Sequence, residues 1–319
     1  MQNHPISDLY SDLKGKTVLI TGASSGIGES AARFLSSLGM RLILAARRID
    51  TLKIIAAEIG NAVEIEMDIS DKESITRGIA TLESQGERID ILINNAGINK
   101  AMKFISNDRD RFEENIKTNL FGTWYLTRIV AKHMVHYKIH GSIINIGSYA
   151  HRTPESFFVP YTTSKAALEH MTRALVGELS PYKIRINCID VGYVKTDLAA
   201  YFKDPSIEKF FNESIIALGF VAEPKHLHAL IAYLASNQAS SYMTGAAIPI
   251  DGGMSVAKLP EHSKHIGEYL INTGKQMAKS EATKNNIKVT KLQTPEESTR
   301  QQTFVDLIKH FDIDNRPKL

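Results

Sequence analysis

Short apolar runs alternate with helical patterns along most of this chain, and no other feature restricts its fold as strongly. Val18–Ile20 and Ile143–Ile146 are almost continuous apolar segments. Strands have this composition when helices cover both faces of a parallel sheet, because neither face then meets water. The repeated strand–helix order predicts a doubly wound α/β domain with right-handed crossovers.

The alternation extends from residue 16 to about residue 250. The helix expected over residues 161–179 shows it clearly, because Leu168, Met171 and Leu175 recur at helical spacing. Strands are predicted at residues 16–21, 41–45, 62–67, 90–94, 142–146, 184–190 and 246–250, and helices at 26–38, 48–59, 71–84, 108–137, 161–179 and 224–235.

The composition excludes several classes of partner. The 319 residues include 38 Lys and Arg against 35 Asp and Glu, and a net charge of +3 without a basic run gives no reason to expect nucleic acid. No stretch approaches the ~18 apolar residues of a membrane span, and Met1–Lys14 lacks the apolar core of a secretory signal. The single cysteine, Cys188, cannot form an internal disulfide, so we expect a cytoplasmic protein.

A glycine-rich segment joins the first strand to the first helix. Glycine permits a tight turn and a close approach of the backbone to a pyrophosphate. The helix that follows offers free N–H groups and the positive end of its dipole. Three glycines alone would be a weak signal, but their position directly after the first strand predicts a dinucleotide-phosphate site. The residues assigned to it are Gly22, Ser24, Ser25, Gly26, Ile27 and Gly28.

The ends of the second and third strands bear on the choice of dinucleotide. NAD-binding versions of this fold have an acidic residue near the end of strand two, where this chain has Ala46 followed by Arg47. A guanidinium suits a 2′-phosphate, so NADP(H) is predicted in preference to NAD(H). The alternative is that Arg47 and Arg48 only decorate a helix start. Asp68, with Ile69 beside it, either accepts from the adenine amino group or caps the helix that begins near Asp71.

Tyr161 and Lys165 are four residues apart on a predicted helix, so they share a face. A free tyrosine has a pKa of ~10, and a nearby ammonium lowers it toward the neutral range in which a proton carrier works best. The spacing proves little by itself, because Tyr10 and Lys14 repeat it before the first strand. The surrounding residues must therefore decide.

Those surroundings supply further candidates. Ser148 ends the fifth strand, where its hydroxyl can stabilise a carbonyl oxygen as negative charge develops there. Asn119 lies in an otherwise apolar helix; its side chain either holds a water that links Lys165 to solvent or satisfies a helix–helix contact. The segment after strand four has small residues that let a ribose approach, namely Asn95, Ala96 and Gly97, which follow Asn94. All these strand ends point to the edge where such sheets bind ligands.

In these motifs the chain resembles the short-chain dehydrogenase/reductase family, in the group with single-domain subunits of ~250 residues. The resemblance covers about residues 13–255 and rests on the glycine segment, Asp68, Asn94–Gly97, Asn119, Ser148, Tyr161 and Lys165. It implies the strand order 3-2-1-4-5-6-7 and a catalytic tetrad of Asn119, Ser148, Tyr161 and Lys165. It also implies that Lys165 binds the nicotinamide ribose while Tyr161 moves the proton, and that Gly192, Val194 and Thr196 line the nicotinamide.

Two departures from the family pattern stand out. Val191 replaces the usual proline before Gly192, in the wall behind the nicotinamide. The chain also continues after the last strand, so we divide it into a dinucleotide-binding and catalytic domain, 1–256, and a partly helical extension, 257–319. Thr294, Pro295 and Glu297 predict a capped helix there. It is expected to pack on the main domain or a sister subunit; a lid over the active site is the alternative.

The substrate is expected to be a small, partly apolar ketone or secondary alcohol. The walls assigned to it are the segment 198–220 and residues 157–159; the alternative is that their aromatics pack the loop or a subunit contact. The side chains concerned are Ala199, Ala200, Tyr201, Phe202, Phe210, Phe211, Ile215, Ile216, Phe157, Phe158 and Val159. Sugars or polyols, 3-oxoacyl thioesters and steroid-like ketones all stay open.

Two other functions are alternatives to an oxidoreductase. A nucleotide-sugar epimerase or dehydratase can share the Tyr–Lys spacing but has a larger C-terminal domain, and a redox-sensing binding protein tends to lose the tyrosine or the lysine. No metal site is expected from the histidines, because surface positions explain His133, His136, His226 and His228 better. The resemblance implies a homotetramer or homodimer formed through the helices 108–137 and 161–179 and the last strand.

Overall fold

The computed structural model describes residues 9–105 and 109–256. Seven parallel strands form one sheet in the order β3-β2-β1-β4-β5-β6-β7, so the expected fold class and strand order are confirmed. The strands are β1 Thr17–Thr21, β2 Arg41–Ala46, β3 Ala62–Glu66, β4 Ile91–Asn94, β5 Ser142–Ile146, β6 Arg185–Val191 and β7 Ala247–Ile250.

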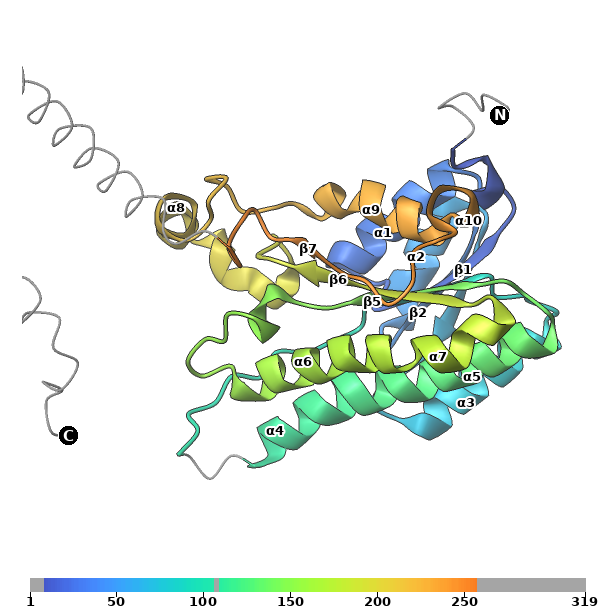
Figure 1. Cartoon of the computed structure of the whole chain (residues 1–319), viewed down its shortest axis with the longest axis horizontal. Helices are drawn as coiled ribbons and strands as arrows, with labels where there is room; N and C mark the ends of the chain where they lie inside the picture. The colour runs from blue at the N-terminus through green and yellow to red at the C-terminus, as the bar shows by residue number, and fades with distance from the viewer. Residues whose placement is uncertain (1–8, 106–108, 257–319) are drawn as a thin grey trace, which may run out of the picture. The chain divides into compact units, whose positions relative to one another are not determined.

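Helices cover both faces of the sheet (Figure 1). One face carries α1 (Gly26–Ser37), α2 (Ile49–Ile59) and α9 (His228–Ala235), which a 3-10 turn at Pro224–Leu227 precedes. The other carries α3 (Lys72–Ser84), α5 (Thr123–His136) and α6 (Val159–Ala174), which α7 (Val176–Leu179) continues.

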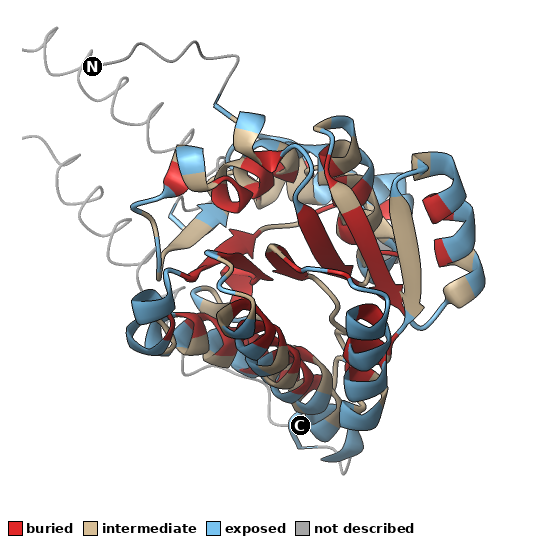
Figure 2. Cartoon of the chain, turned by 90° about the vertical axis from the view of Figure 1, so that its right-hand side faces the viewer, coloured by how far each residue is buried: buried red, intermediate tan, exposed pale blue. Residues whose placement is uncertain are grey.

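Side chains along the strands alternate between two cores. Val18 and Ile20 pack toward α1, α2 and α9, whereas Leu19 between them packs toward α3 and α5, and all three are fully buried. This two-sided burial is the reason for the continuous apolar runs in the sequence. Figure 2 shows buried strands enclosed by helices whose outer faces are exposed.

The helix expected over residues 108–137 is interrupted. α4 (Arg109–Ile116) runs into a π-helical segment at Lys117–Gly122, and α5 follows without a break. Gly122 lies so close to the loop after β3 that an added Cβ would be 1.7 Å from the Ile69 carbonyl oxygen. The wider π turn brings Asn119 and Gly122 against the loops that follow β4 and β3.

Several short elements were not predicted. α8 (Pro205–Ser214) lies within the segment assigned to the substrate, and α10 (Asn237–Ser240) follows α9. The Asp204 side chain caps α8 by accepting from the Ser206 N–H, and Pro205 occupies its first turn. This N-cap and proline signal was present in the sequence and could have located the helix.

The topology of the sheet indicates where a ligand can bind. The strand order reverses at β1, so a crevice opens between the loops that follow β1 and β4, at the carboxyl edge. Among the described residues, no helix is long and apolar enough to cross a bilayer. The extension 257–319, with the helix expected from Thr294, lies outside the described residues.

Candidate active site

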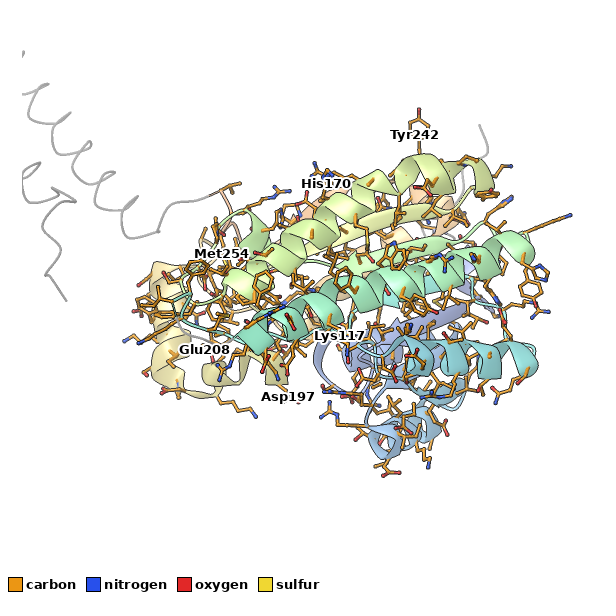
Figure 3. All side chains as sticks on the ribbon, turned by 90° about the horizontal axis from the view of Figure 1, so that it is seen from below. Lys117, His170, Asp197, Glu208, Tyr242 and Met254 are labelled. Carbon is orange, nitrogen blue, oxygen red and sulfur yellow. The ribbon has the colours of Figure 1, made fainter. Side chains whose placement is uncertain are left out.

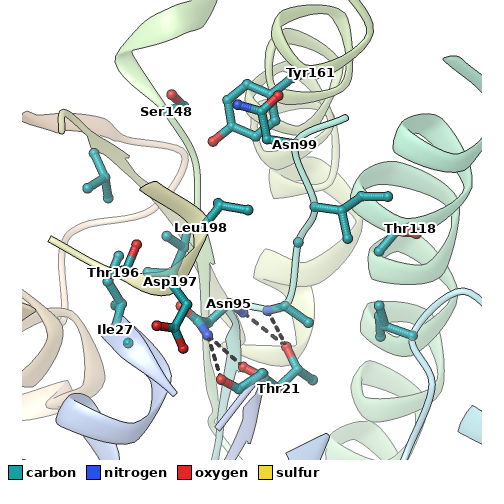
Figure 4. A pocket seen from close by; sticks show the side chains of 18 of the residues that line it. Thr21, Ile27, Asn95, Asn99, Thr118, Ser148, Tyr161, Thr196, Asp197 and Leu198 are labelled. Carbon is teal, nitrogen blue, oxygen red and sulfur yellow. Dashed lines mark hydrogen bonds between the residues drawn. The ribbon is translucent and has the colours of Figure 1, made fainter. Parts of the chain in front are cut away.

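A cavity of about 900 Å³ opens at the carboxyl edge of the sheet, lined by the segments that follow β1 to β6. Every residue assigned to the cofactor from the sequence lines it except Gly28. Of the four tetrad residues, Ser148, Tyr161 and Lys165 line it, and Asn119 does not. The fold thus gathers segments that are up to 178 positions apart, from Thr21 to Ala199, around one space, part of which Figure 4 shows.

The glycine segment is held close to the loop after β4. An added Cβ at Gly28 would lie 2.4 Å from the Gly22 carbonyl oxygen and 2.6 Å from Asn95 Nδ2. Asn95 Nδ2 in turn donates to the Thr21 carbonyl at 2.9 Å (Figure 4). Ser25, the N-cap of α1, makes no side-chain cap, so the first N–H groups of α1 stay available to a phosphate. Gly28 therefore shapes the segment from behind.

Two arginines follow β2 at the edge of the cavity. Arg47 is exposed and lines the cavity, as the sequence led us to expect. Arg48 donates from Nε and Nη2 to Ser24 Oγ, at 3.1 and 3.0 Å, and from Nη2 to Ser25 Oγ at 2.8 Å. Arg48 was not assigned a site role from the sequence, yet it binds the glycine segment directly. The adjacent RR pair was the signal available.

Asp68 and Ile69 both line the cavity after β3. Asp68 Oδ1 accepts from the Ser70 N–H at 2.8 Å and from the Ser70 hydroxyl at 2.7 Å. The N-cap of α3 is Asp71, whose side chain accepts from the Glu73 N–H. The alternative in which Asp68 caps this helix is therefore wrong, because Asp71 does so, and Asp68 fixes the turn before it.

Ser148, Tyr161 and Lys165 meet at the end of β5. Lys165 Nζ donates to the Ile146 carbonyl at 2.7 Å and lies 5.8 Å from the centre of the Tyr161 ring. In Figure 4 the Ser148 and Tyr161 side chains lie at the same end of the cavity, and Ser148 acts to lower the pKa of the Tyr161 phenol. Tyr10 and Lys14, which repeat the Tyr–Lys spacing, do not line the cavity. Context thus separates the pair at the site from its repeat.

Burial dominates the protonation of this pair. It lowers the pKa of the Lys165 ammonium to about 8, against a smaller opposing effect of Cys188 and Asp190. It also raises the pKa of the Tyr161 phenol above its ordinary value, and the nearby Ser148 side chain only partly offsets this. The expectation that Lys165 lowers this pKa is not met by the protein's own groups, because desolvation of the phenol outweighs the other contributions.

Asn119 braces the site from behind. It is 1% exposed; its Oδ1 accepts from the Ile98 N–H at 2.9 Å, and its Nδ2 donates to the Ile98 carbonyl and to Ser164 Oγ. Both amide hydrogens are thus engaged, and the side chain ties the loop after β4 to α6. That it also holds a relay water stays a prediction.

The segment after β6 forms the part of the cavity wall that the sequence analysis assigned to the nicotinamide. Gly192, Val194 and Thr196 line the cavity. Val194 pairs with Ala222 through an isolated bridge, and the Thr196 methyl lies 3.1 Å from where a Cβ at Gly26 would be. Val191, which replaces the family's proline, is the last residue of β6 and also lines the cavity.

The aromatic residues proposed as substrate walls divide into two groups. Phe158 and Ala199 line the cavity, together with Tyr149, Tyr193 and Leu198. Phe202, Phe211 and Ile216 do not line the cavity; as the alternative held, they pack in an apolar cluster, which also includes Tyr149, Tyr193 and Ala199 of the cavity wall. The side chains of Ala200 and Tyr201 lie outside the described residues. Glu155, which no sequence signal singled out, also lines this end of the cavity.

A charged cluster behind Ser148 was also not foreseen. His151 Nδ1 donates to the Ser148 carbonyl at 2.5 Å, and His151 Nε2 lies 2.6 Å from Glu169 and 3.6 Å from Asp190. Arg152 and Arg173 pair with these carboxylates. Of the four histidines first considered, His133 is buried against the Ile89 N–H and Glu83 rather than lying on the surface, and His228 stacks on Phe34.

Known proteins resemble this chain over the same region. A family model described as enoyl-(acyl carrier protein) reductase matches residues 22–255. A 3-oxoacyl-(acyl-carrier-protein) reductase of Aquifex aeolicus is 33% identical over 76% of this chain and 98% of its own length. A 3beta-hydroxysteroid dehydrogenase of Eggerthella lenta is 33% identical over 78% of this chain and 97% of its own length. The crystal structure of a short-chain type dehydrogenase/reductase from Mycobacterium marinum superimposes with a TM-score of 0.74, at 33% identity over 79% of this chain and 100% of that one.

Proposed function

Because this chain belongs to the short-chain dehydrogenase/reductase family of oxidoreductases, we propose that it transfers a hydride between NADP(H) and a ketone or secondary alcohol. The observation that carries the proposal is the convergence of Ser148, Tyr161 and Lys165 on the cavity that the glycine segment opens. The close-set Gly28 and the uncapped start of α1 suit a dinucleotide, since a side chain at Gly28 would displace the phosphate loop.

The protein's groups divide the work of the reaction. When bound, the dinucleotide supplies hydride to the carbon that bears the oxygen, or takes it away, and its oxidised ring adds a positive charge near the phenol. Ser148 donates to the carbonyl oxygen and stabilises the charge that develops there. Tyr161 gives its proton to the forming alkoxide in reduction and takes it back in oxidation. Lys165 holds a positive charge beside the phenol, and Asn119 keeps the loop after β4 in place for the relay water.

Carbonyl reduction requires Tyr161 to start in its protonated form. The phenol keeps its proton at neutral pH among the protein's own groups, so it is poised as an acid toward a carbonyl oxygen. We also propose a cytoplasmic setting, because the single thiol of the chain, Cys188, is free and buried.

The functional test compares NADPH oxidation by the wild type and Tyr161→Phe over a panel of carbonyl compounds. We expect Tyr161→Phe to reduce kcat by about 10²–10⁴-fold, because it removes the general acid. Its dissociation constant for NADPH, measured by fluorescence, should change less than threefold or so. Tight NADPH binding by the wild type with no turnover of any carbonyl would contradict the proposal and favour a redox sensor.

The preference for NADP(H) has its own test. Arg47 and Arg48 are the cations at the end of β2, where the position of an acidic residue is taken by Ala46. We expect Arg47→Ser to raise KM for NADPH by about 10–100-fold while changing KM for NADH far less, since only NADPH carries the 2′-phosphate and Arg48 is left in place to hold the glycine segment. Lys53→Ser, on α2, is the matched control. Equal effects on both dinucleotides would refute the assignment.

A further inference from the structure

A carboxylate lies at the substrate end of the cavity, and the tetrad mechanism does not use it. Glu155 belongs to the loop before α6, is half-buried and lines the same cavity as Ser148 and Tyr161. Its Oε1 accepts from the Tyr193 hydroxyl at 2.5 Å and also from the Tyr149 hydroxyl. Two donors from the segments after β5 and β6 thus converge on one oxygen of one acid.

Packing fixes these two donors in place. Tyr149 is 5% exposed, and its ring centre lies 5.3 Å from that of Tyr193, which packs edge-on against Phe211 at 4.5 Å. Burial raises the pKa of Tyr149, so its hydroxyl stays protonated and donating. The carboxylate is therefore held by groups that cannot easily turn toward a ligand, and its orientation is set before any substrate arrives.

The second oxygen of this acid is left open. Among the side chains that the structure describes, which leave out those of Ala200 and Tyr201, Glu155 Oε2 has no hydrogen-bond partner and no lysine or arginine forms an ion pair with Glu155. The neighbouring Arg152 is directed to Asp190. A carboxylate oxygen on a residue that lines a cavity is a strong acceptor, and leaving it unpaired when a ligand displaces the surrounding water is costly.

A second acceptor lies on the same cavity. Asn99 Oδ1 is buried and has no hydrogen-bond partner among the described residues. Asn99 comes from the loop after β4, and in the view of Figure 4 it lies at the same end of the cavity as Ser148 and Tyr161. Two partnerless acceptors around the reacting position call for a ligand that brings its own donors.

The other charges of the cavity do not cancel this preference. Lys100 is paired with Glu114. Lys117 lines the cavity from the π-helical segment, and Arg47 and Arg48 line it after β2. Lys165 also lines the cavity, but its Nζ is engaged by the Ile146 carbonyl and belongs to the proposed catalytic group. A substrate anion beside Glu155 would therefore face a like charge, and among the described side chains no lysine or arginine is paired with Glu155, so this placement is unfavourable in a partly desolvated space.

We propose that Glu155 determines specificity, and that the substrate class is a neutral hydroxy-ketone, or the corresponding diol, whose hydroxyl group donates to Glu155 while its carbonyl oxygen meets Ser148 and Tyr161. This rests on the proposed hydride transfer and narrows it. Carbonyl compounds with a carboxylate in place of that hydroxyl are excluded by charge, and the same ketones without the hydroxyl leave the acceptor unpaired.

The test uses ketones that differ only in the group distant from the carbonyl. The probes are 4-hydroxybutan-2-one, 5-hydroxypentan-2-one, pentan-2-one and 4-oxopentanoate, assayed by NADPH oxidation. For the wild type we expect kcat/KM for the better hydroxy-ketone to exceed that for pentan-2-one by about 10-fold or more, and that for 4-oxopentanoate by about 100-fold. Glu155→Gln should reduce the first ratio to about threefold and raise the rate with 4-oxopentanoate by about 10-fold, because the charge is gone.

Two further variants make the outcome specific. Tyr193→Phe keeps the charge and the ring but removes one of the two donors, so it should weaken the hydroxyl preference while 4-oxopentanoate stays excluded. Glu178→Gln, an exposed change on α7, should leave both ratios as they are. Unchanged ratios in a folded, active Glu155→Gln variant would overturn the specificity proposal while leaving hydride transfer intact.

A binding readout covers the case of slow turnover. With saturating NADP⁺, butane-1,3-diol and pentane-1,4-diol should raise the unfolding temperature of the wild type more than 4-hydroxypentanoate does, and Glu155→Gln should abolish this order. If the order is absent in the wild type, Glu155 does not select hydroxyl donors. NADPH binding without turnover of any probe or of the wider carbonyl panel counts against the proposed hydride transfer instead.

Discussion

Lys165 keeps its ammonium group in surroundings that oppose the charge. It is 5% exposed, and burial lowers its pKa from 10.5 to about 8. A fall of this size corresponds to roughly 3 kcal/mol of lost stability at neutral pH. The site thus carries a strain that serves the chemistry and not the fold, as is common where a charge must face a ligand.

Removing this charge should stabilise the protein. We expect Lys165→Met to raise the free energy of unfolding at pH 7 by about 2 kcal/mol. Removing the buried charge gains about 3 kcal/mol, and the Ile146 carbonyl, which loses its donor, costs about 1 kcal/mol of this. Between pH 8 and 10.5 the unfolded wild type binds the additional proton, so wild-type stability rises with pH and the advantage of the variant declines. Urea unfolding without dinucleotide measures this; a less stable variant at pH 7 would contradict it. Lys53→Met is the control: the Lys53 side chain is exposed, so its removal should not raise the stability in this way.

The proximity of Tyr161 and Lys165 was predictable, because residues four positions apart on a helix lie next to each other on one face. The balance of effects on the Tyr161 pKa was not predictable, because it depends on how many atoms of other segments surround the phenol. The same holds for Glu155. Its partner Tyr193 is 38 residues away, and no local pattern announces that contact.

At the scale of elements, the π-helical segment between α4 and α5 joins two parts of the site. Its Asn119 holds Ile98 after β4, and its Gly122 touches Ile69 after β3. The sequence predicted a continuous helix here, because apolar periodicity distinguishes poorly between an α turn and a π turn. The loops that this segment supports decide its geometry.

Gly122 gives the element-scale prediction. An added methyl at this position would meet the Ile69 backbone at 1.7 Å, so the loop or the helix must move. We expect Gly122→Ala to cost about 2–4 kcal/mol of stability and to weaken dinucleotide binding through Ile69. Gly177→Ala in α7, where nothing lies within 4 Å, should instead stabilise by up to about 1 kcal/mol. Thermal unfolding of both variants tests this; similar effects would show that the close approach has no role.

For the whole molecule, the outer side of α4 and α5 exposes large apolar side chains. Phe121 is 61% exposed and Trp124 44% exposed, and Tyr242, before β7, points away from the ribbon in Figure 3. Burying such side chains against a second copy removes apolar area from water. On the basis of these exposed side chains we propose the expected homotetramer or homodimer, formed through these helices and the last strand.

Light scattering at micromolar concentration is the measurement. The wild type should elute as a dimer or tetramer, and Trp124→Glu should shift it toward the monomer, because a buried charge at the contact is unfavourable. Ile54→Glu, at an exposed apolar position on α2, should leave the assembly unchanged. A monomeric wild type would refute the proposal.

The sequence by itself determined the sheet, its strand order through the family resemblance, and the position of the glycine segment and of the Tyr–Lys pair. These follow from apolar periodicity, glycine placement and helical spacing, which act over a few residues. Only the tertiary structure decided that Glu155 meets Tyr149 and Tyr193, that His151 lies between Glu169 and Asp190, and that Arg48 holds the glycine segment. Such contacts join segments that the fold alone brings together, so no local pattern encodes them.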